Sequence, residues 1–545
     1  MIFLELIIFL FSIIFISSSM SGYGKLINLK EKNFFLEIFL GLIITTLIIT
    51  IVHFFLKINF WISLFVFISG VFFFLLKKNI NFKKFIEKKN INYLIIICLL
   101  IPIYISQKYH EDFGYYHLPY AVSFIEEKIV FGFANINNAY VYNSIWLNLY
   151  SIFFLPNKNF DYLTLPSFIL FLNFILFAFY QIFSKNKTSI SNYYLVVVLF
   201  YFILKFTRIS EFGVDLPAAT FSILAIYYFI KFSEVITIEI KKEYFYLISL
   251  FSIFSILIKL STLPIILLPI FLYFKYFKDL KDTIFKLNYL FIYFLLIIFL
   301  IQQFIYTGCI FFPTNLTCLN VNWFNEDNIN LSHKLELINK SYSLARDIYT
   351  PEEYLKNYNW LIFWAKRSYT EISEHFFTII IPSLLFIFLI KKRKKNNLLL
   401  EDKSGLYIFL ILGLLFWLNF SPVYRFAIHL FVTFVFIILL GQLSSKDISK
   451  KIFSVFTMIF IFFSFSKNIV RLTKVENIFL GILKIENQYI LNNTNTNQIR
   501  KIFRPDIKKN SANGWQGRLC WNIPFICSYN SLEVKKKYGY LIINK

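Results

Sequence analysis

Glycine, proline, cysteine and charged residues are all scarce in this sequence of 545 residues. It has 15 Gly, 13 Pro and 5 Cys, and only 16% of its residues are charged. Collagen-like fibres and disordered linkers are rich in Gly and Pro, and small disulfide scaffolds are rich in Cys, so none of these classes fits. Hydrophobic residues make up 58% of the chain. Because soluble domains keep this fraction below about half, the composition predicts a membrane protein.

The apolar runs distinguish the two architectures that can span a bilayer. The run FFLEIFLGLIITTLIITIVHFFL, residues 34–56, is apolar on every side and long enough to cross. A closed barrel would require strands of about ten residues in which apolar and polar positions alternate. We therefore expect an all-α membrane protein built as a polytopic helical bundle. Apolar runs between charged or Asn-rich loops predict about fourteen transmembrane helices: 2–19, 34–56, 60–76, 93–107, 160–184, 193–207, 216–232, 244–259, 262–275, 287–306, 376–391, 405–420, 424–441 and 451–468.

Lysine and arginine collect in alternate loops of this bundle. Counted on one side, 27 of them lie in the loops 20–33, 77–92, 185–192, 231–243, 275–286, 391–404 and 444–451. The opposite side holds only 8 basic residues, not counting two long segments, the loop 307–375 and the C-terminal tail 469–545. Cytoplasmic loops retain basic residues, which sets the orientation. The net charge of +24 is thus largely a topology signal beside anionic lipid, and a nucleic-acid partner is not implied. Glu5 argues against a cleaved signal peptide, so the first helix is expected to remain.

Two cysteine pairs lie in the long segments on the far side of the membrane. Cys309 and Cys318 are nine residues apart and Cys520 and Cys527 are seven apart, so neither pair has the CxxC spacing of a zinc site. An oxidising compartment favours a disulfide in each pair over two free thiols. Cys98 lies inside the fourth predicted helix. The pairs also favour an extracytoplasmic tail, although its many basic residues leave the cytoplasmic side as the alternative.

The first candidate site follows the fourth predicted helix. Glu111 and Asp112 emerge there, followed by Tyr116 and His117. Residues 119–156 mix apolar and polar positions and are expected to form two amphipathic helices lying on the membrane, within an outer loop 108–159. A carboxylate between a helix exit and such helices would be partly desolvated, as a general base requires. The alternative is an interfacial belt in which Tyr and His lie at headgroup depth and the acids are solvated.

Three further charged residues lie at the same predicted face. Asp215, in EFGVDLP, is placed either to serve a site or to cap a helix. Lys259, in LIKLSTLP, and Arg425, in SPVYRF, could grip a phosphate or could extend harmlessly to the headgroups. Charged residues in the predicted spans lie near helix ends, and no inverted repeat is evident, which disfavours a transporter.

The order of these parts resembles the GT-C superfamily of integral-membrane glycosyltransferases. The fourth helix, the Glu111-Asp112 pair and residues 119–156 resemble that superfamily's first outer loop, and seven helices over 93–306 precede the large outer loop 307–375. Lys259 in IKLSTLP resembles the Lys-Gly-Pro region of the aminoarabinose and protein-mannosyl transferases, except that Gly is absent. Arg425 in PVYRF resembles their Pro-x-Arg-Tyr segment.

The resemblance covers roughly residues 93–441, and the motifs YHLP (116–119), EFGVDLP and CWNIPFIC look like those of largely uncharacterised bacterial members. Three regions lie outside the seven-helix module and its loop. They are the additional helices in 1–92, the C-terminal helices in 376–468 and the extracytoplasmic tail 469–545.

The resemblance implies an inverting transfer of a sugar from a polyprenyl-phosphate donor. Asp112 would accept the proton of the acceptor hydroxyl, Glu111 would orient Asp112, and Lys259 and Arg425 would neutralise the departing phosphate. Asp215 would position the acceptor or help to hold a divalent cation, and Tyr116 and His117 would lie against substrate. No resident cofactor is implied. A metal held by His110, Asp112 and His117 is conceivable, but solvated His beside acids is common. In the large loop, Trp323, Trp360 and Trp364 could stack on sugar rings or simply pack.

The acceptor would be a lipid-linked glycan, a polysaccharide or a protein. The bias toward Lys, Asn, Ile and Phe favours a bacterial cytoplasmic membrane, with the site on the periplasmic side. A polysaccharide polymerase or ligase, a lipid-oligosaccharide transporter and an inactive membrane scaffold are the rival interpretations. The identity of the sugar is not encoded in a recognisable motif.

Overall fold

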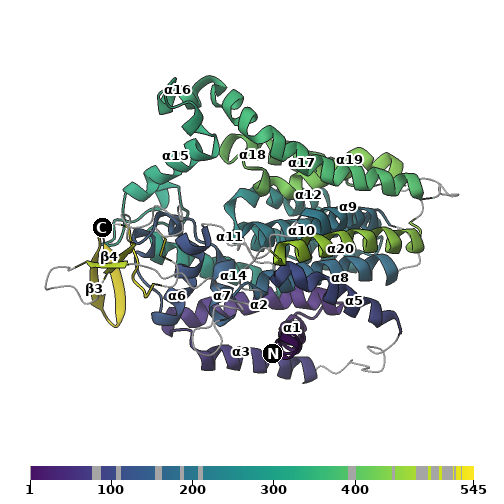
Figure 1. Ribbon diagram of the computed structural model, residues 1–545, viewed down its shortest axis with the longest axis horizontal. Coiled ribbons are helices and arrows are strands. Elements are labelled where there is room, and N and C mark those ends of the chain that lie inside the picture. The colour runs from purple at the N-terminus through teal and green to yellow at the C-terminus, as the bar shows by residue number, and fades with distance from the viewer. Residues whose placement is uncertain are drawn as a thin grey trace.

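Helices dominate the computed structural model. It describes residues 2–76, 88–105, 112–153, 163–184, 189–205, 213–390, 400–444, 448–473, 489–492, 502–505, 519–520, 523–529 and 531–544. Most of the long helices run beside one another along the length of the molecule (Figure 1). They are α1 (Ile2–Gly24), α2 (Phe34–Phe55), α3 (Phe60–Leu76), α5 (Lys88–Ile105), α8 (Leu165–Ser184), α9 (Ile190–Lys205), α10 (Asp215–Glu234), α11 (Ile238–Ile258), α12 (Leu267–Lys275), α14 (Leu287–Thr307), α17 (Trp360–Leu389), α18 (Lys403–Phe420), α19 (Ile428–Ser444) and α20 (Lys450–Leu472).

Short helices and strands connect these elements and make up the tail. The short helices are a π-helix η1 (Phe113–His117), α6 (Leu118–Glu126), η2 (Phe133–Asn135), η3 (Asn138–Val141), α7 (Ile145–Tyr150), η4 (Ser151–Phe153), η6 (Leu260–Ile266), α13 (Phe277–Leu280), η7 (Asn315–Thr317), α15 (Asp327–Asn339), η8 (Tyr342–Leu344), α16 (Pro351–Leu355), η9 (Lys356–Tyr358) and η10 (Tyr424–Ala427). The strands are β1 (Tyr489–Asn492), β2 (Ile502–Pro505), β3 (Glu533–Lys537) and β4 (Tyr540–Asn544).

Every predicted span contains a helix. Within the described residues nine helices are long and apolar enough to cross a membrane, and four shorter helices are apolar. The remaining one, α11, has the length of a span but begins with the charged sequence IEIKKE. The all-α prediction is therefore confirmed for the main body of the chain, whose apolar helices are candidate membrane spans.

Two predicted spans differ most clearly from the structure. Helix α17 begins at Trp360 rather than near 376, because the stretch 360–375 contains no Gly or Pro to end a helix. Its first half projects beyond the bundle together with α15 and α16 (Figure 1). The predicted span 262–275 consists of η6 followed by α12, and Pro264 lies inside η6.

The loops expected to share the cytoplasmic side meet at one end of the bundle. Lys231 Nζ lies 2.7 Å from Glu31 Oε2, which joins the segment after α1 to the end of α10. Lys275 Nζ lies 2.6 Å from Asp402 Oδ1, which joins the end of α12 to the start of α18. These pairs connect four loops that the distribution of basic residues assigned to one side.

The residues 112–153 lie at the opposite end, and we call them the outer shelf. Its helices were expected to be amphipathic and to lie on the membrane, and this is wrong: α6 and α7 are buried within the protein. Their polar side chains bond to one another and to the long helices. Tyr120 OH donates to Asn148 Oδ1 at 2.6 Å, and Asn148 Nδ2 donates to Thr50 Oγ1 at 2.8 Å and to Gln302 Oε1 at 3.1 Å. The polar positions are thus satisfied inside the protein and not by water.

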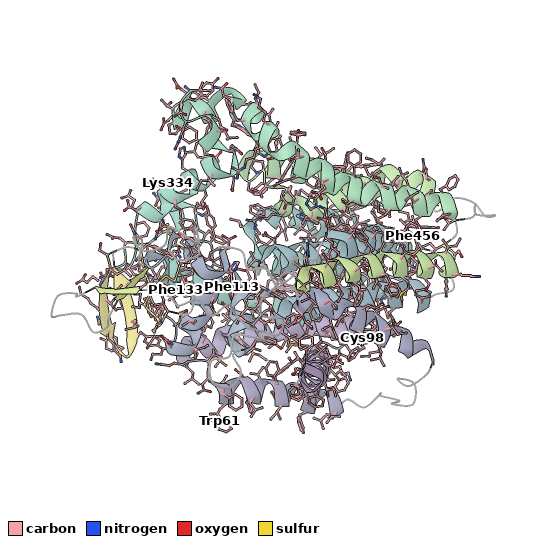
Figure 2. The ribbon with its side chains drawn as sticks, viewed as in Figure 1. Trp61, Cys98, Phe113, Phe133, Lys334 and Phe456 are labelled. Atoms are coloured by element: carbon pink, nitrogen blue, oxygen red, sulfur yellow. A yellow bond between two sulfur atoms is a disulfide. The ribbon has the colours of Figure 1, made fainter. Side chains whose placement is uncertain are left out.

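The tail adds two small antiparallel sheets that the all-α prediction omitted. Strands β3 and β4 pair through a two-residue turn at Tyr538 and Gly539, whose φ values of 51° and 76° are those of a type I′ hairpin. The tail lies at the outer-shelf end, since Ile543 N–H donates to Phe131 O at 2.9 Å and Asn135 Nδ2 donates to Ile543 O at 2.9 Å. Phe133 of the shelf and the hairpin lie toward the same end of the molecule (Figure 2).

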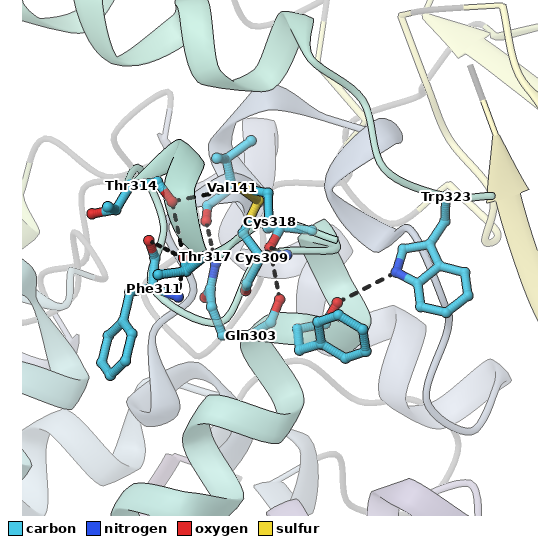
Figure 3. The surroundings of a disulfide bond; sticks show 10 residues. Val141, Gln303, Cys309, Phe311, Thr314, Thr317, Cys318 and Trp323 are labelled. Carbon is cyan, nitrogen blue, oxygen red and sulfur yellow. Dashed lines mark hydrogen bonds between the residues drawn. A yellow bond between two sulfur atoms is a disulfide. The ribbon is translucent and has the colours of Figure 1, made fainter. Parts of the chain in front are cut away.

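Two disulfides, Cys309–Cys318 and Cys520–Cys527, have the pairing expected from the sequence. The first closes the chain just after α14. Beside it, Gln303 Nε2 donates to Val141 O at 3.0 Å, so the loop is held against the shelf (Figure 3). Cys98 is a free, exposed thiol within α5.

Opposite ends of the bundle should react on opposite sides of the membrane. In a Cys98→Ser background, Leu316→Cys and Phe285→Cys place a thiol at side chains that are 96% and 81% exposed, one at each end. We expect a membrane-impermeant maleimide to label only one of the two in intact cells and both after permeabilisation. Labelling of both in intact cells would contradict the assignment of these loops to separate ends.

Candidate functional site

Four charged side chains from four separate elements meet at the outer-shelf end. Lys259, at the end of α11, forms an ion pair with Asp215, the first residue of α10. Arg425 in η10 lies between the two carboxylates: its Nε is 3.2 Å from Asp215 Oδ2 and its Nη2 is 3.8 Å from Asp112 Oδ2. The four residues that the sequence indicated one by one therefore form a connected group.

A π-helix places Asp112 beside this group. Asp112 immediately precedes η1, residues 113–117, which leads into α6. Pro119 has no N–H, so the carbonyl of Tyr115 lacks the donor that a regular α-helix would supply. Asn137 Nδ2 donates to that carbonyl at 3.0 Å instead. Such π-turns are frequent at functional sites, and the Asp112 side chain remains 29% exposed.

Hydroxyl groups in the connection between α11 and η6 fix the backbone of Lys259. Thr262 N–H and Oγ1 donate to Lys259 O at 3.1 and 2.9 Å, and Ser255 Oγ donates to Thr262 Oγ1 at 2.9 Å. The ammonium lies 3.3 Å from the centroid of the Phe426 ring, within range of a cation–π interaction. Burial lowers the pKa of Lys259 to about 8, and the neighbouring Asp215 carboxylate opposes this shift.

Two tryptophans fix the segment that carries Arg425. Trp364 Nε1 of α17 donates to Pro422 O at 2.5 Å, and Trp417 Nε1 of α18 donates to Val423 O at 2.8 Å. These bonds hold the chain just before η10 to two long helices. Of the two roles considered for Trp364, stacking on a sugar or packing, its burial supports packing.

The other tryptophans proposed for sugar stacking also pack within the protein. Trp360 is 1% exposed, and Lys340 Nζ lies 4.6 Å from the centroid of its ring. Trp323 Nε1 donates to Phe304 O at 3.3 Å, and its ring centroid lies 4.9 Å from that of Phe131 (Figure 3 draws the hydrogen bond of Trp323 as a dashed line). The three rings therefore stabilise the large loop and its attachment to the bundle.

Tyr116 and His117 are the last two residues of η1, which Asp112 precedes. Their ring centroids are 4.0 Å apart, and Tyr116 is partly exposed whereas His117 is 1% exposed. Burial lowers the pKa of His117 to about 4, so its ring is neutral at pH 7. Direct contact of His117 with substrate is therefore disfavoured, and Tyr116 remains the candidate for that contact.

Part of the metal site considered from the sequence lies outside the described residues. Glu111 and His110 lie outside the described residues, so their predicted roles stay predictions. Among the residues that are described, no three His, Cys, Asp or Glu side chains are grouped closely enough to hold a metal ion. His117 is buried and neutral beside Tyr116, and Asp112 is paired with Arg425.

Sequence reasoning missed a second polar group beside η10. The His375 ring of α17 lies 4.4 Å from the ring of Tyr424, and Tyr201 OH lies 2.8 Å from His375 Nδ1. Glu374 pairs with Lys205 next to it. The adjacent Glu374 and His375 were visible in the sequence, but they were assigned to the end of a loop and not to the middle of α17.

A family model matches residues 4–432 of this chain, and its description is "Domain of unknown function (DUF8201)". Because the match covers more than half of the chain, the protein belongs to this family. No curated protein and no solved structure matches this chain. Asp112, Asp215, Lys259 and Arg425 all lie within the matched residues, whereas the tail lies beyond them.

Proposed function

We propose that this member of the DUF8201 family is a GT-C-type glycosyltransferase that moves a sugar from a polyprenyl-phosphate donor to an extracytoplasmic acceptor. All fourteen helices would cross the bacterial cytoplasmic membrane, with the outer shelf, the large loop and the tail on the periplasmic side. The observation that carries the proposal is the joining of Asp112, Asp215, Lys259 and Arg425 at one end of the bundle. Two cations beside a carboxylate suit a reaction that releases a phosphate and takes up a proton.

The transfer would be a single displacement. The acceptor oxygen attacks the anomeric carbon while Asp112 takes its proton, and the bond from that carbon to the phosphate oxygen breaks. The electron pair of that bond leaves with the lipid phosphate, whose negative charge Lys259 and Arg425 stabilise. Attack from the face opposite the phosphate inverts the configuration of the sugar.

Asp215 acquires a role that differs from the expected contact with the acceptor. It pairs with both Lys259 and Arg425, and 18% of its side chain is exposed. A carboxylate between two cations fixes their positions before the phosphate arrives, so we assign Asp215 to orienting them. It is a positioning residue in this mechanism.

A polysaccharide polymerase or ligase is the second candidate, because it would use outer Arg and His residues. His375 lies against Tyr424, the neighbour of Arg425. A transporter has less support, since the ion pairs Lys231–Glu31, Lys259–Asp215 and Lys275–Asp402 lie near helix ends and not in the middle of the helices.

Loss of the base should abolish transfer. Asp112→Asn removes the proton acceptor at nearly constant shape, so we expect turnover of radiolabelled polyprenyl-phosphate sugars in lipid nanodiscs to fall about a hundredfold or more. The turnover of Arg425→Ala should fall by a similar factor, because one stabilising cation is lost. The matched controls are Asp347→Asn and Arg346→Ala, which make the same changes at two exposed side chains of the large loop 307–375. Full activity in Asp112→Asn, with loss in His375→Ala, would favour the polymerase or ligase.

Binding of the donor phosphate should weaken as the pH rises through about 8. The Lys259 ammonium is charged below its pKa of about 8 and neutral above it, so its attraction for phosphate is present at pH 7 and is lost by about pH 9. In Lys259→Arg the charge persists, and affinity for polyprenyl phosphate should stay level over that range. An equal decline in both proteins would exclude Lys259 as the titrating group.

A further inference from the structure

The C-terminal tail contacts the outer shelf, the segment that begins with Asp112. Phe525 N–H donates to Glu126 Oε2 at 2.7 Å, and Ser528 Oγ donates to Ile136 O at 2.8 Å. Both donors and both acceptors come from segments that are distant in the sequence. The tail is therefore fixed to the shelf and does not merely follow α20.

Tyr529 extends this contact to the residues next to Asp112. Its ring centroid lies 5.6 Å from that of Tyr115, and the Tyr115 ring lies 6.1 Å from that of Tyr116. All three rings are partly exposed, as is Asp112. The disulfide Cys520–Cys527 closes the chain two residues before Tyr529. A tail residue thus borders the surface on which the proposed base is exposed.

The outer shelf carries a fourth tyrosine, Tyr140, in η3. Tyr140 is buried, and its ring is stacked on Phe133 at 4.4 Å. Burial raises the pKa of Tyr140, and the hydroxyls of Tyr529, Tyr115 and Tyr116 raise it further. Burial and the Asp112 carboxylate raise the pKa of Tyr115 as well. The hydroxyls therefore stay protonated at neutral pH and can donate hydrogen bonds.

We propose that Tyr115, Tyr116 and Tyr529 form a subsite for a sugar ring of the acceptor, so that the tail helps to determine acceptor specificity. Aromatic rings present flat apolar faces to the C–H face of a sugar, while their hydroxyls can bond to sugar hydroxyls. The subsite adjoins Asp112, which places a sugar hydroxyl near the base. This inference rests on the proposed function, and it commits the acceptor to a glycan and not a protein. Tyr529 lies outside residues 4–432, so the family model does not cover the residue that we assign to acceptor specificity.

The test combines a binding readout with kinetics on the full-length protein in nanodiscs. p-Benzoyl-L-phenylalanine replaces Tyr529 or, as the matched control, Tyr538 at the exposed tip of the β3–β4 hairpin. Photolysis with radiolabelled octyl glucoside, octyl mannoside and octyl galactoside then reports sugar proximity without any need for transfer. In parallel, Tyr529→Ala, Tyr529→Phe and Tyr538→Ala are compared for KM toward these glycosides and for Kd toward polyprenyl phosphate.

We expect cross-linking at position 529 to exceed that at 538. Tyr529→Ala should raise the glycoside KM about tenfold with an unchanged Kd for polyprenyl phosphate, and Tyr529→Phe should have a smaller effect. Equal cross-linking at the two positions would overturn the inference. So would a Tyr529→Ala protein that loses polyprenyl-phosphate binding, because its defect would then be structural. Cross-linking at 529 without any transfer by the wild type would refute the proposed function and leave the sugar subsite standing.

Discussion

The pairing of Asp215 with Lys259 and Arg425 is the interaction on which the outer end of this protein depends. It joins α10, the end of α11 and η10, and Arg425 continues it to Asp112 before the π-helix. Taking charges out of water is costly unless each has a partner, so the four residues are stable here only as a group. The same mutual compensation leaves the group electrically balanced, and an arriving phosphate would share cations that are already in position.

The surrounding fold serves mainly to hold those elements in register. Hydroxyls of Ser255 and Thr262 fix the turn that carries Lys259, and the indoles of Trp364 and Trp417 fix the turn that carries Arg425. The network around Asn148 binds the outer shelf to α2 and α14. Rigid support of this kind allows a few charged side chains on short turns to keep a fixed geometry at a membrane surface.

The sequence was sufficient to predict the helices, and it singled out four charged residues, Asp112, Asp215, Lys259 and Arg425, that the structure brings together. Both depend on strong local signals. Long apolar runs in this sequence are stable as helices that span a bilayer. A charged residue next to such a run, such as Lys259, is easily recognised in the sequence. The buried shelf could not be predicted in this way. Asn148 in an apolar segment looks the same whether it faces water or an internal partner such as Gln302, which is 154 residues away. The π-turn after Asp112 and the β3–β4 hairpin likewise depend on tertiary partners, Asn137 for the former and the shelf for the latter.

The most direct measurement is a cryo-EM structure of the protein in nanodiscs saturated with polyprenyl phosphate. The account predicts density for the phosphate within about 3 Å of both Lys259 Nζ and the Arg425 guanidinium. The Asp112 carboxylate should face the phosphate across the space that the sugar of the donor would occupy. The isoprenoid chain should pass from there into the bilayer. A phosphate bound elsewhere, with Lys259 and Arg425 still paired only to Asp215 and Asp112, would contradict it.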